Sequence, residues 1–189
     1  MIEKIEAYDR LVSITGRRNV NIHDVDEFLR LLKDEAKPCT VQLFDADCVA
    51  GAKHLFFAAV NAVRAVEQKR NVSDSLSMET MLYASCQRQI RKALDMLGVK
   101  PNTSKVAVLL IDKNENTISD AESRVAQRID GVRDDEALEI REKKKVQRLK
   151  RLFDISDLEV ETLSDGEIGV EDAVTQLIIE RTALLVLEG

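Results

Sequence analysis

The sequence has no tryptophan, and its 189 residues include only two tyrosines, five phenylalanines and two histidines. So few aromatic side chains argue against a broad base-stacking platform for nucleic acid. With two histidines, acid–base catalysis would have to rest on carboxylates or lysines. No glycine-rich phosphate loop, nucleophile elbow or His-x-x-x-His ligand pair occurs. We therefore predict a protein that is not an enzyme and needs no cofactor.

Long apolar segments are also absent. The longest run, near Ala183–Leu187, is far shorter than the roughly 20 residues of a membrane helix. The N-terminal residues MIEKIEAYDR carry acidic side chains where a signal peptide is basic and then apolar. We therefore expect a cytoplasmic protein without membrane contact.

Cys39, Cys48 and Cys86 show no Cys-x-x-Cys spacing, so we expect reduced thiols and no metal site.

The overall composition is that of a globular protein, with 44% hydrophobic and 33% charged residues. We expect residues 1–189 to form a single domain. The formal net charge of −6 argues against a surface that follows a nucleic-acid backbone over its whole extent, because lysine and arginine drive phosphate binding. Any contact with RNA should therefore be local.

The spacing of apolar residues predicts three strands, over Tyr8–Thr15, Thr40–Phe44 and Lys105–Asp112. Gly16 is expected to close the first strand. The same spacing predicts helices over Ile22–Ala36, Cys48–Lys69, Met78–Leu97 and Val170–Leu187, and two weaker helices within residues 113–151. The expected helix caps are Asn21, either Asp45 or Asp47, and Ser77, with Gly98 ending the third helix. We expect a turn at Ile155–Leu158 and a loop at Asp165–Gly169.

The helix predicted over Cys48–Lys69 has an apolar stripe rich in alanine. Such small side chains suit a central helix packed between the sheet and other helices. In the next helix, Glu79 falls in line with Leu82, and two interpretations remain open. It is either an acidic residue of a first helical turn, stabilised by the macrodipole, or a buried carboxylate held by His54 or Lys53.

Basic side chains gather on both long helices, and further charge follows the strand Lys105–Asp112. Lys53 and Arg64 project from one side of the first helix, with Arg70 beyond its end, and Arg88, Arg91 and Lys92 flank the second. They are either a binding surface or ordinary surface charge. The basic run Arg141–Arg151 is likewise either a solvated helix face or a phosphate-contacting patch.

The predicted C-terminal helix is apolar nearly all round. Such a helix is either deeply buried or covered by another molecule.

Several of these residues form a family signature. Gly51-x-Lys53-His54-Leu55, the spacing Leu76-x-x-Glu79-x-x-Leu82-Tyr83, and Arg88-Gln89-Ile90 occur in this order, followed by the strand VAVLLI. In this combination the chain resembles the kinase-binding small subunit of the KEOPS (EKC) tRNA-modification complex, the PRPK-binding protein family. Residues 113–151 are longer and more charged than the connections typical of that family.

The resemblance implies an α/β (α+β) fold with a small, mainly antiparallel sheet surrounded by several helices, and no enzymatic activity. It implies two direct partners: the atypical small kinase/ATPase of the complex, and tRNA, captured through its single-stranded 3′ CCA end. The threonylcarbamoyl transferase subunit, an indirect partner, would then form threonylcarbamoyladenosine in tRNA.

Carried over by position, the resemblance assigns RNA binding to Lys53, His54, Arg88 and Gln89, and proximity adds Arg64, Arg70, Arg91 and Lys92. His54 would stack on a base or orient Glu79. The apolar C-terminal helix suggests kinase binding by Leu177, Ile178 and Leu185, with core burial as the alternative. Two other functions stay open: a protein-only kinase adaptor without RNA contact, and an undetected enzyme.

Overall fold

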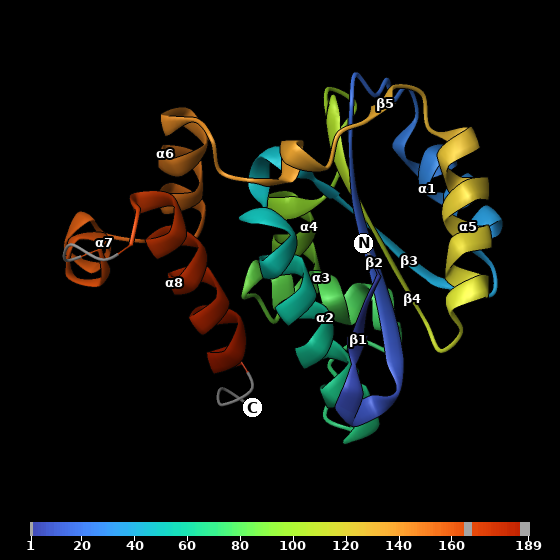
Figure 1. Ribbon diagram of the computed structural model, residues 1–189, viewed down its shortest axis with the longest axis horizontal. Helices are drawn as coiled ribbons and strands as arrows, with labels where there is room; N and C mark the ends of the chain where they lie inside the picture. The colour runs from blue at the N-terminus through green and yellow to red at the C-terminus, as the bar shows by residue number, and fades with distance from the viewer. Residues whose placement is uncertain (1, 165–167, 186–189) are drawn as a thin grey trace.

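The computed structural model describes residues 2–164 and 168–185, which form eight α-helices and a five-stranded sheet (Figure 1). The strands are β1 (Ile2–Ile5), β2 (Arg10–Arg18), β3 (Thr40–Asp45), β4 (Lys105–Asp112) and β5 (Val132–Arg133). The helices are α1 (Val25–Ala36), α2 (Gly51–Glu67), α3 (Leu76–Ser85), α4 (Ile90–Leu97), α5 (Glu115–Arg128), α6 (Lys143–Leu152), α7 (Asp157–Leu163) and α8 (Val170–Leu184). Short 3-10 helices η1 (Glu6–Tyr8), η2 (Ala46–Cys48) and η3 (Asp135–Leu138) join them.

The sheet has the order β1-β2-β4-β3, β5 also pairs with β2, and every pair is antiparallel. The predicted α+β class with an antiparallel sheet is therefore confirmed. Strand β4 has the predicted bounds and lies between β2 and β3. Its continuous apolar sequence fits that place, because Val106–Ile111 are all buried.

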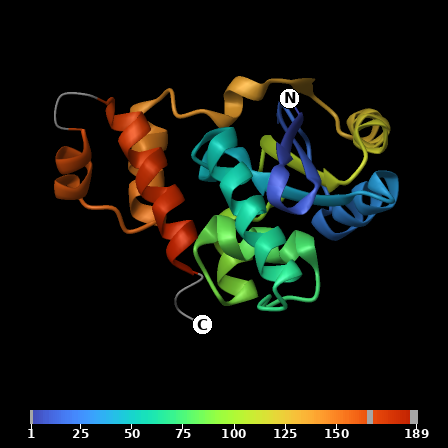
Figure 2. The same cartoon turned by 60° about the horizontal axis from the view of Figure 1, so that its bottom comes forward.

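The two faces of β4 belong to different cores, as the period of two along a strand requires. Val106, Val108 and Leu110 pack with residues of α1 and α5, whereas Leu109 and Ile111 pack with residues of α2, α3 and α8. Helices α6, α7 and α8 lie beyond α2 and α3, on the side away from the sheet (Figures 1 and 2).

Helix α2 occupies the central position that its alanines predict. It contacts β2 of the sheet, and it also packs against α3 and α8. Ala58, Ala59 and Ala62 have no exposed surface, and Ala65 has 4%. None of the described helices is long and apolar enough to span a bilayer.

Near the N-terminus, three predicted boundaries are wrong. Tyr8 belongs to η1, so the first predicted strand starts later, at Arg10. Gly16 lies inside β2, opposite Ala107, where its missing side chain makes room for the backbone oxygen of Asp134. Helix α1 begins at Val25 because the side chain of Asp24, not that of Asn21, accepts a hydrogen bond from the N–H of Glu27. The short strand β1, which pairs with β2, was not predicted.

The predicted helix Cys48–Lys69 starts later, at Gly51. Asp45 caps η2 by accepting a hydrogen bond from the Asp47 N–H, and it does not cap α2. The N-cap of α2 is Ala50, whose N–H donates to the imidazole of His54.

The predicted helix Met78–Leu97 is two helices. Helix α3 is capped by Ser75, not Ser77, and ends at Ser85 because Cys86 adopts a left-handed conformation with φ of 54°. Gln89 is the N-cap of α4, and α4 ends before Gly98 as predicted. In the link between the two helices, Arg88 and Gln89 are exposed.

The C-terminal third agrees with the predicted helices in part. Helices α5 and α6 confirm the two weaker helices predicted within residues 113–151. The predicted turn Ile155–Leu158 runs into α7, which a capping box of Ser156 and Glu159 starts. Helix α8 begins at Val170 as predicted; residues 165–167 of the predicted loop and 186–187 of the predicted helix lie outside the described residues.

Candidate functional site

A pocket of about 520 Å³ lies beside the C-terminal end of α2. Three arginines line it from three segments: Arg64 on α2, Arg70 in the α2–α3 loop and Arg88 in the α3–α4 link. The other lining residues are Asn61, Ala65, Gln68, Val72, Glu79, Leu82, Tyr83, Gln87 and Leu185. We call this the arginine pocket.

The end of α2 brings Arg70 to the pocket. Lys69 adopts a left-handed conformation with φ of 56°, which turns the chain back after the helix. The N–H of Arg70 then donates to the Ala65 carbonyl over 2.8 Å, so the last turn of α2 keeps its hydrogen bonds. Arg70 thereby lines the same pocket as Arg64, although the helix has ended between them.

Glu79 holds the α2–α3 loop from the side of α3. Its carboxylate Oε2 accepts hydrogen bonds from the N–H groups of Val72, over 3.0 Å, and Ser73, over 2.8 Å. Glu79 is in the first turn of α3 and is 1% exposed. Glu79 is therefore a buried carboxylate in a first helical turn. The predicted partners, His54 and Lys53, are wrong, because backbone N–H groups donate to its carboxylate instead.

Tyr83 forms part of the wall of the arginine pocket. Burial raises the pKa of the Tyr83 phenol, and the nearby Glu79 carboxylate raises it further, against the opposing effect of Arg88 and Arg64. The phenol is therefore neutral at pH 7, and it can donate or accept a hydrogen bond. Sequence reasoning assigned Tyr83 no role beyond its place in the family signature.

The structure brings together three of the predicted RNA-binding residues. Arg64, Arg70 and Arg88 all line the arginine pocket, and none forms a salt bridge with a described carboxylate. The other four surface candidates are exposed and lie outside the pocket lining: Lys53, Gln89, Arg91 and Lys92.

His54 is in the core, so its predicted place on an RNA-facing surface is wrong. Its side chain has no exposed surface. Nδ1 accepts from the Ala50 N–H over 3.1 Å, Nε2 lies 2.8 Å from the Ala84 carbonyl oxygen, and the ring meets Phe153 edge to face. Burial lowers the pKa of His54 to about 4, so the ring is neutral at pH 7. It neither stacks on a base nor orients Glu79.

The three residues predicted to bind a kinase are also buried. Leu177, Ile178 and Leu185 are 9%, 0% and 6% exposed and belong to the core formed with α2 and α3. The alternative interpretation, core burial, therefore holds for them. Among the large apolar residues of α8, Val170 at 44% and Leu184 at 53% are exposed.

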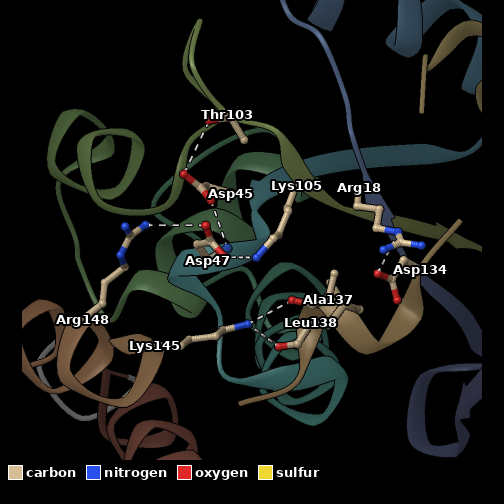
Figure 3. A network of polar contacts seen from close by, with 10 residues as sticks. All are labelled: Arg18, Asp45, Asp47, Thr103, Lys105, Asp134, Ala137, Leu138, Lys145 and Arg148. Carbon is tan, nitrogen blue, oxygen red and sulfur yellow. Dashed lines mark hydrogen bonds and ion pairs between the residues drawn. The ribbon is translucent and has the colours of Figure 1, made fainter. Parts of the chain in front are cut away.

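A second polar region lies at the other end of α2 (Figure 3). The carboxylate of Asp47 on η2 lies 3.2 Å from Nζ of Lys105 and 4.0 Å from Nη1 of Arg148. Nζ of Lys145 donates to the carbonyl oxygens of Ala137, over 3.1 Å, and Leu138, over 2.7 Å. These contacts join β4, η2, η3 and α6, so the basic run Arg141–Arg151 is partly anchored to the rest of the fold.

Binding is the chemistry that the arginine pocket supports. Guanidinium groups suit phosphate and carboxylate ligands, and the one carboxylate in the lining, Glu79, is engaged by the backbone. The described residues contain no group of three His, Cys, Asp or Glu side chains placed to hold a metal ion.

Comparison with known proteins shows similarity to a protein family and to one archaeal protein. Residues 19–185 match the family described as kinase binding protein CGI-121. The regulatory protein Cgi121 of Methanocaldococcus jannaschii is 32% identical over 114 residues, which cover 60% of this chain and 70% of that protein. The family match includes the arginine pocket up to Leu185 and extends across residues 113–151.

Proposed function

This chain belongs to the kinase-binding protein CGI-121 family, and from that membership we propose that it is a non-catalytic accessory subunit of the KEOPS complex. In this proposal it binds the atypical kinase/ATPase of the complex and recruits tRNA through the single-stranded 3′ CCA end. Another subunit would then perform the threonylcarbamoyl transfer.

The observation that carries the RNA part of the proposal is the convergence of Arg64, Arg70 and Arg88 on one pocket. Its volume of about 520 Å³ falls in the range of pockets that hold small ligands, so it suits a nucleoside with its phosphate. Gripping a few unstacked nucleotides needs only such a local pocket, which is compatible with the net charge of −6.

For the kinase we propose a contact on the exposed side of α8. Leu184 is a large apolar residue that is half exposed there, at the end of a helix whose other side is buried against α2 and α3. Exposed apolar residues at the rim of a hollow are typical of protein interfaces, and Leu184 borders one with Leu152 and Arg181.

The test compares full-length tRNA with tRNA lacking its terminal CCA, in binding to the purified protein at several salt concentrations. We expect salt-dependent binding that is mostly lost on trimming, because the single-stranded end would no longer enter the pocket. Equal affinity for both RNAs would reject CCA recognition. Kinase binding without any tRNA binding would instead support a protein-only adaptor.

A further inference from the structure

A small basic hollow lies at the end of α2 opposite the arginine pocket. It has a volume of about 90 Å³ and is lined by Asp47, Lys105, Glu142, Lys144, Lys145 and Arg148. We call it the lysine hollow. It contains no aromatic side chain and is too small for a nucleoside, but it can take a tetrahedral oxyanion.

Positive charge is in excess in the lysine hollow. Four cationic side chains face two carboxylates, and Asp47 is shared between Lys105 and Arg148. Lys144 forms no salt bridge with a described carboxylate. The cations come from β4 and α6, which the chain brings together from positions about 40 residues apart. An added anion would therefore be attracted by Lys105, Lys145 and Arg148, whose contacts with other elements already hold them in place, and by the exposed Lys144.

Lys145 supports the same interpretation. Its ammonium group donates to two backbone carbonyls, which leaves one of its three N–H groups for another acceptor. Burial lowers the pKa of Lys145 to about 8, although Asp47 and Glu139 oppose this shift and Lys105 adds to it. The neighbouring carboxylates therefore do not fully compensate the buried charge.

The start of α6 concentrates this charge further. Its first turn contains Lys143, Lys144 and Lys145, no acidic residue, and no side-chain cap. Lysines at this end of a helix repel the positive end of the macrodipole, and the only anion at the helix start among the described residues is the N-cap carboxylate of Glu142, so a bound phosphate would stabilise the arrangement further. The clustered lysines therefore lower the stability of the folded chain, which is typical of residues kept for binding.

Helix α4 links the two basic regions along the chain. It starts just after Arg88 of the arginine pocket and ends at Leu97, followed by Lys100 and then Lys105 of the lysine hollow. Its exposed side carries Arg91 and Lys92. The two regions lie at opposite ends of α2, whose 17 residues rise about 25 Å, a distance that one folded RNA molecule can span.

We infer that the lysine hollow binds a backbone phosphate of tRNA outside the 3′ CCA end. This inference rests on the proposed function, and it separates the roles of the two regions. The arginine pocket holds the single-stranded end, and the lysine hollow positions the body of the RNA. A small hollow with four cations recognises phosphate and not base, so this contact is independent of sequence.

The test uses the variant Lys144→Gln/Arg148→Gln, which spares the structural contacts of Lys145. Its matched control is Arg30→Gln/Lys33→Gln, the same charge change on exposed residues of α1, on the other side of the sheet (Figure 1). Binding is measured with full-length tRNA and with a short single-stranded RNA ending in CCA, at several salt concentrations. A melting curve for each variant verifies the fold.

We expect the Lys144→Gln/Arg148→Gln variant to bind full-length tRNA about tenfold more weakly, with a salt slope smaller by about 0.7–0.9, because one phosphate contact is lost. Its binding of the short RNA should equal that of wild type. A full-length slope and affinity equal to those of the control variant would overturn the inference. Weaker binding to the partner kinase with unchanged tRNA binding would also overturn it, since the hollow would then serve a protein.

If the proposed function itself fails, the results for the wild-type protein will differ from those expected. In that case the wild-type protein would not distinguish intact from trimmed tRNA, and the short RNA would not bind. Failure of the lysine hollow alone would leave both of those wild-type results as expected and would appear only in the variant.

Discussion

The imidazole Nε2 of His54 donates a hydrogen bond to the backbone carbonyl oxygen of Ala84, 2.8 Å away. The tautomer follows from the other ring nitrogen, because Nδ1 accepts the N–H of Ala50 and must be unprotonated. One neutral ring therefore joins the start of α2 to the end of α3, and its edge-to-face contact with Phe153 adds the end of α6.

We predict that this arrangement makes the protein sensitive to acid. The pKa of His54 is about 4 in the folded chain, below its ordinary value of 6.5, so the unfolded chain binds the proton first as the pH falls. The stability that neutral His54 provides is complete above pH 6.5 and is lost progressively toward pH 4, by up to about 3 kcal/mol. Urea unfolding at a series of pH values from neutral to mildly acidic measures it.

The control for this prediction is His54→Gln. This variant should be less stable at pH 7 but should have a flatter pH profile in the acidic range. The pKa of Glu159, lowered to about 2 by its hydrogen bonds with Ser156 and Arg181, affects stability only at lower pH. Parallel profiles for wild type and variant would contradict the role of His54.

The lowered pKa of Lys145 predicts a second effect of pH on stability, this time on the alkaline side of neutrality. Its folded pKa of about 8 is below the ordinary 10.5, so between these values the unfolded chain holds a proton that the folded chain has lost, and stability rises with pH. We expect a rise of up to about 1 kcal/mol between about pH 8 and 9 that the Lys145→Met variant lacks. At higher pH the Cys39 thiol, whose pKa burial raises to about 11, acts in the other direction. Equal slopes for the two proteins over this interval would refute the assignment.

The arginine pocket predicts that two charge-reversing substitutions differ in their effect on tRNA binding, a difference that the sequence alone could not predict. Arg88→Glu places a carboxylate in the pocket lining and should weaken tRNA binding about tenfold or more, whereas Arg91→Glu, on the exposed side of α4, should have a smaller effect. Titrations of both variants with the short CCA-ended RNA decide the matter. If the two reversals were equivalent, general surface charge and not the pocket would govern binding.

Helix α8 predicts a separation of stability from kinase binding. Ile178→Ala should cost about 2–5 kcal/mol of unfolding free energy, because Ile178 is fully buried. Leu184→Ala removes a half-exposed side chain, so it should leave the melting temperature nearly unchanged while weakening kinase capture. Unaltered capture by the Leu184→Ala variant would remove this surface from the proposed kinase contact.

Periodicity predicted the parts of this fold that bury one continuous apolar sequence. Strand β4 and the central place of helix α2 followed from the order of their apolar residues, because few environments accept VAVLLI or an alanine-rich stripe. The break after α3 could not be predicted, since the left-handed residue is Cys86, and nothing in its side chain favours that conformation. The polar residues after it resemble the exposed face of a continuous helix.

The candidate site was predictable in charge but not in position. Arg64, Arg70 and Arg88 were among the basic candidates, but only the turn at Lys69 and the break at Cys86 set them around one pocket. His54 was wrongly predicted to face RNA because the burial of α2 on a second side was not foreseen. Helix α2 is buried on two sides, so a residue next to its main apolar stripe still faces a core.

Helix α2 also sets the distance between the arginine pocket and the lysine hollow. Its 17 residues rise about 25 Å, with the arginine pocket at one end and the lysine hollow at the other. Because the sheet lies along one side and α3 and α8 along the other, this span is fixed before any ligand arrives. If both regions bind one RNA as proposed, the protein would favour a polyanion whose own folded shape presents charge at a matching separation. A flexible strand would bind less well, because it must give up conformational freedom to fit.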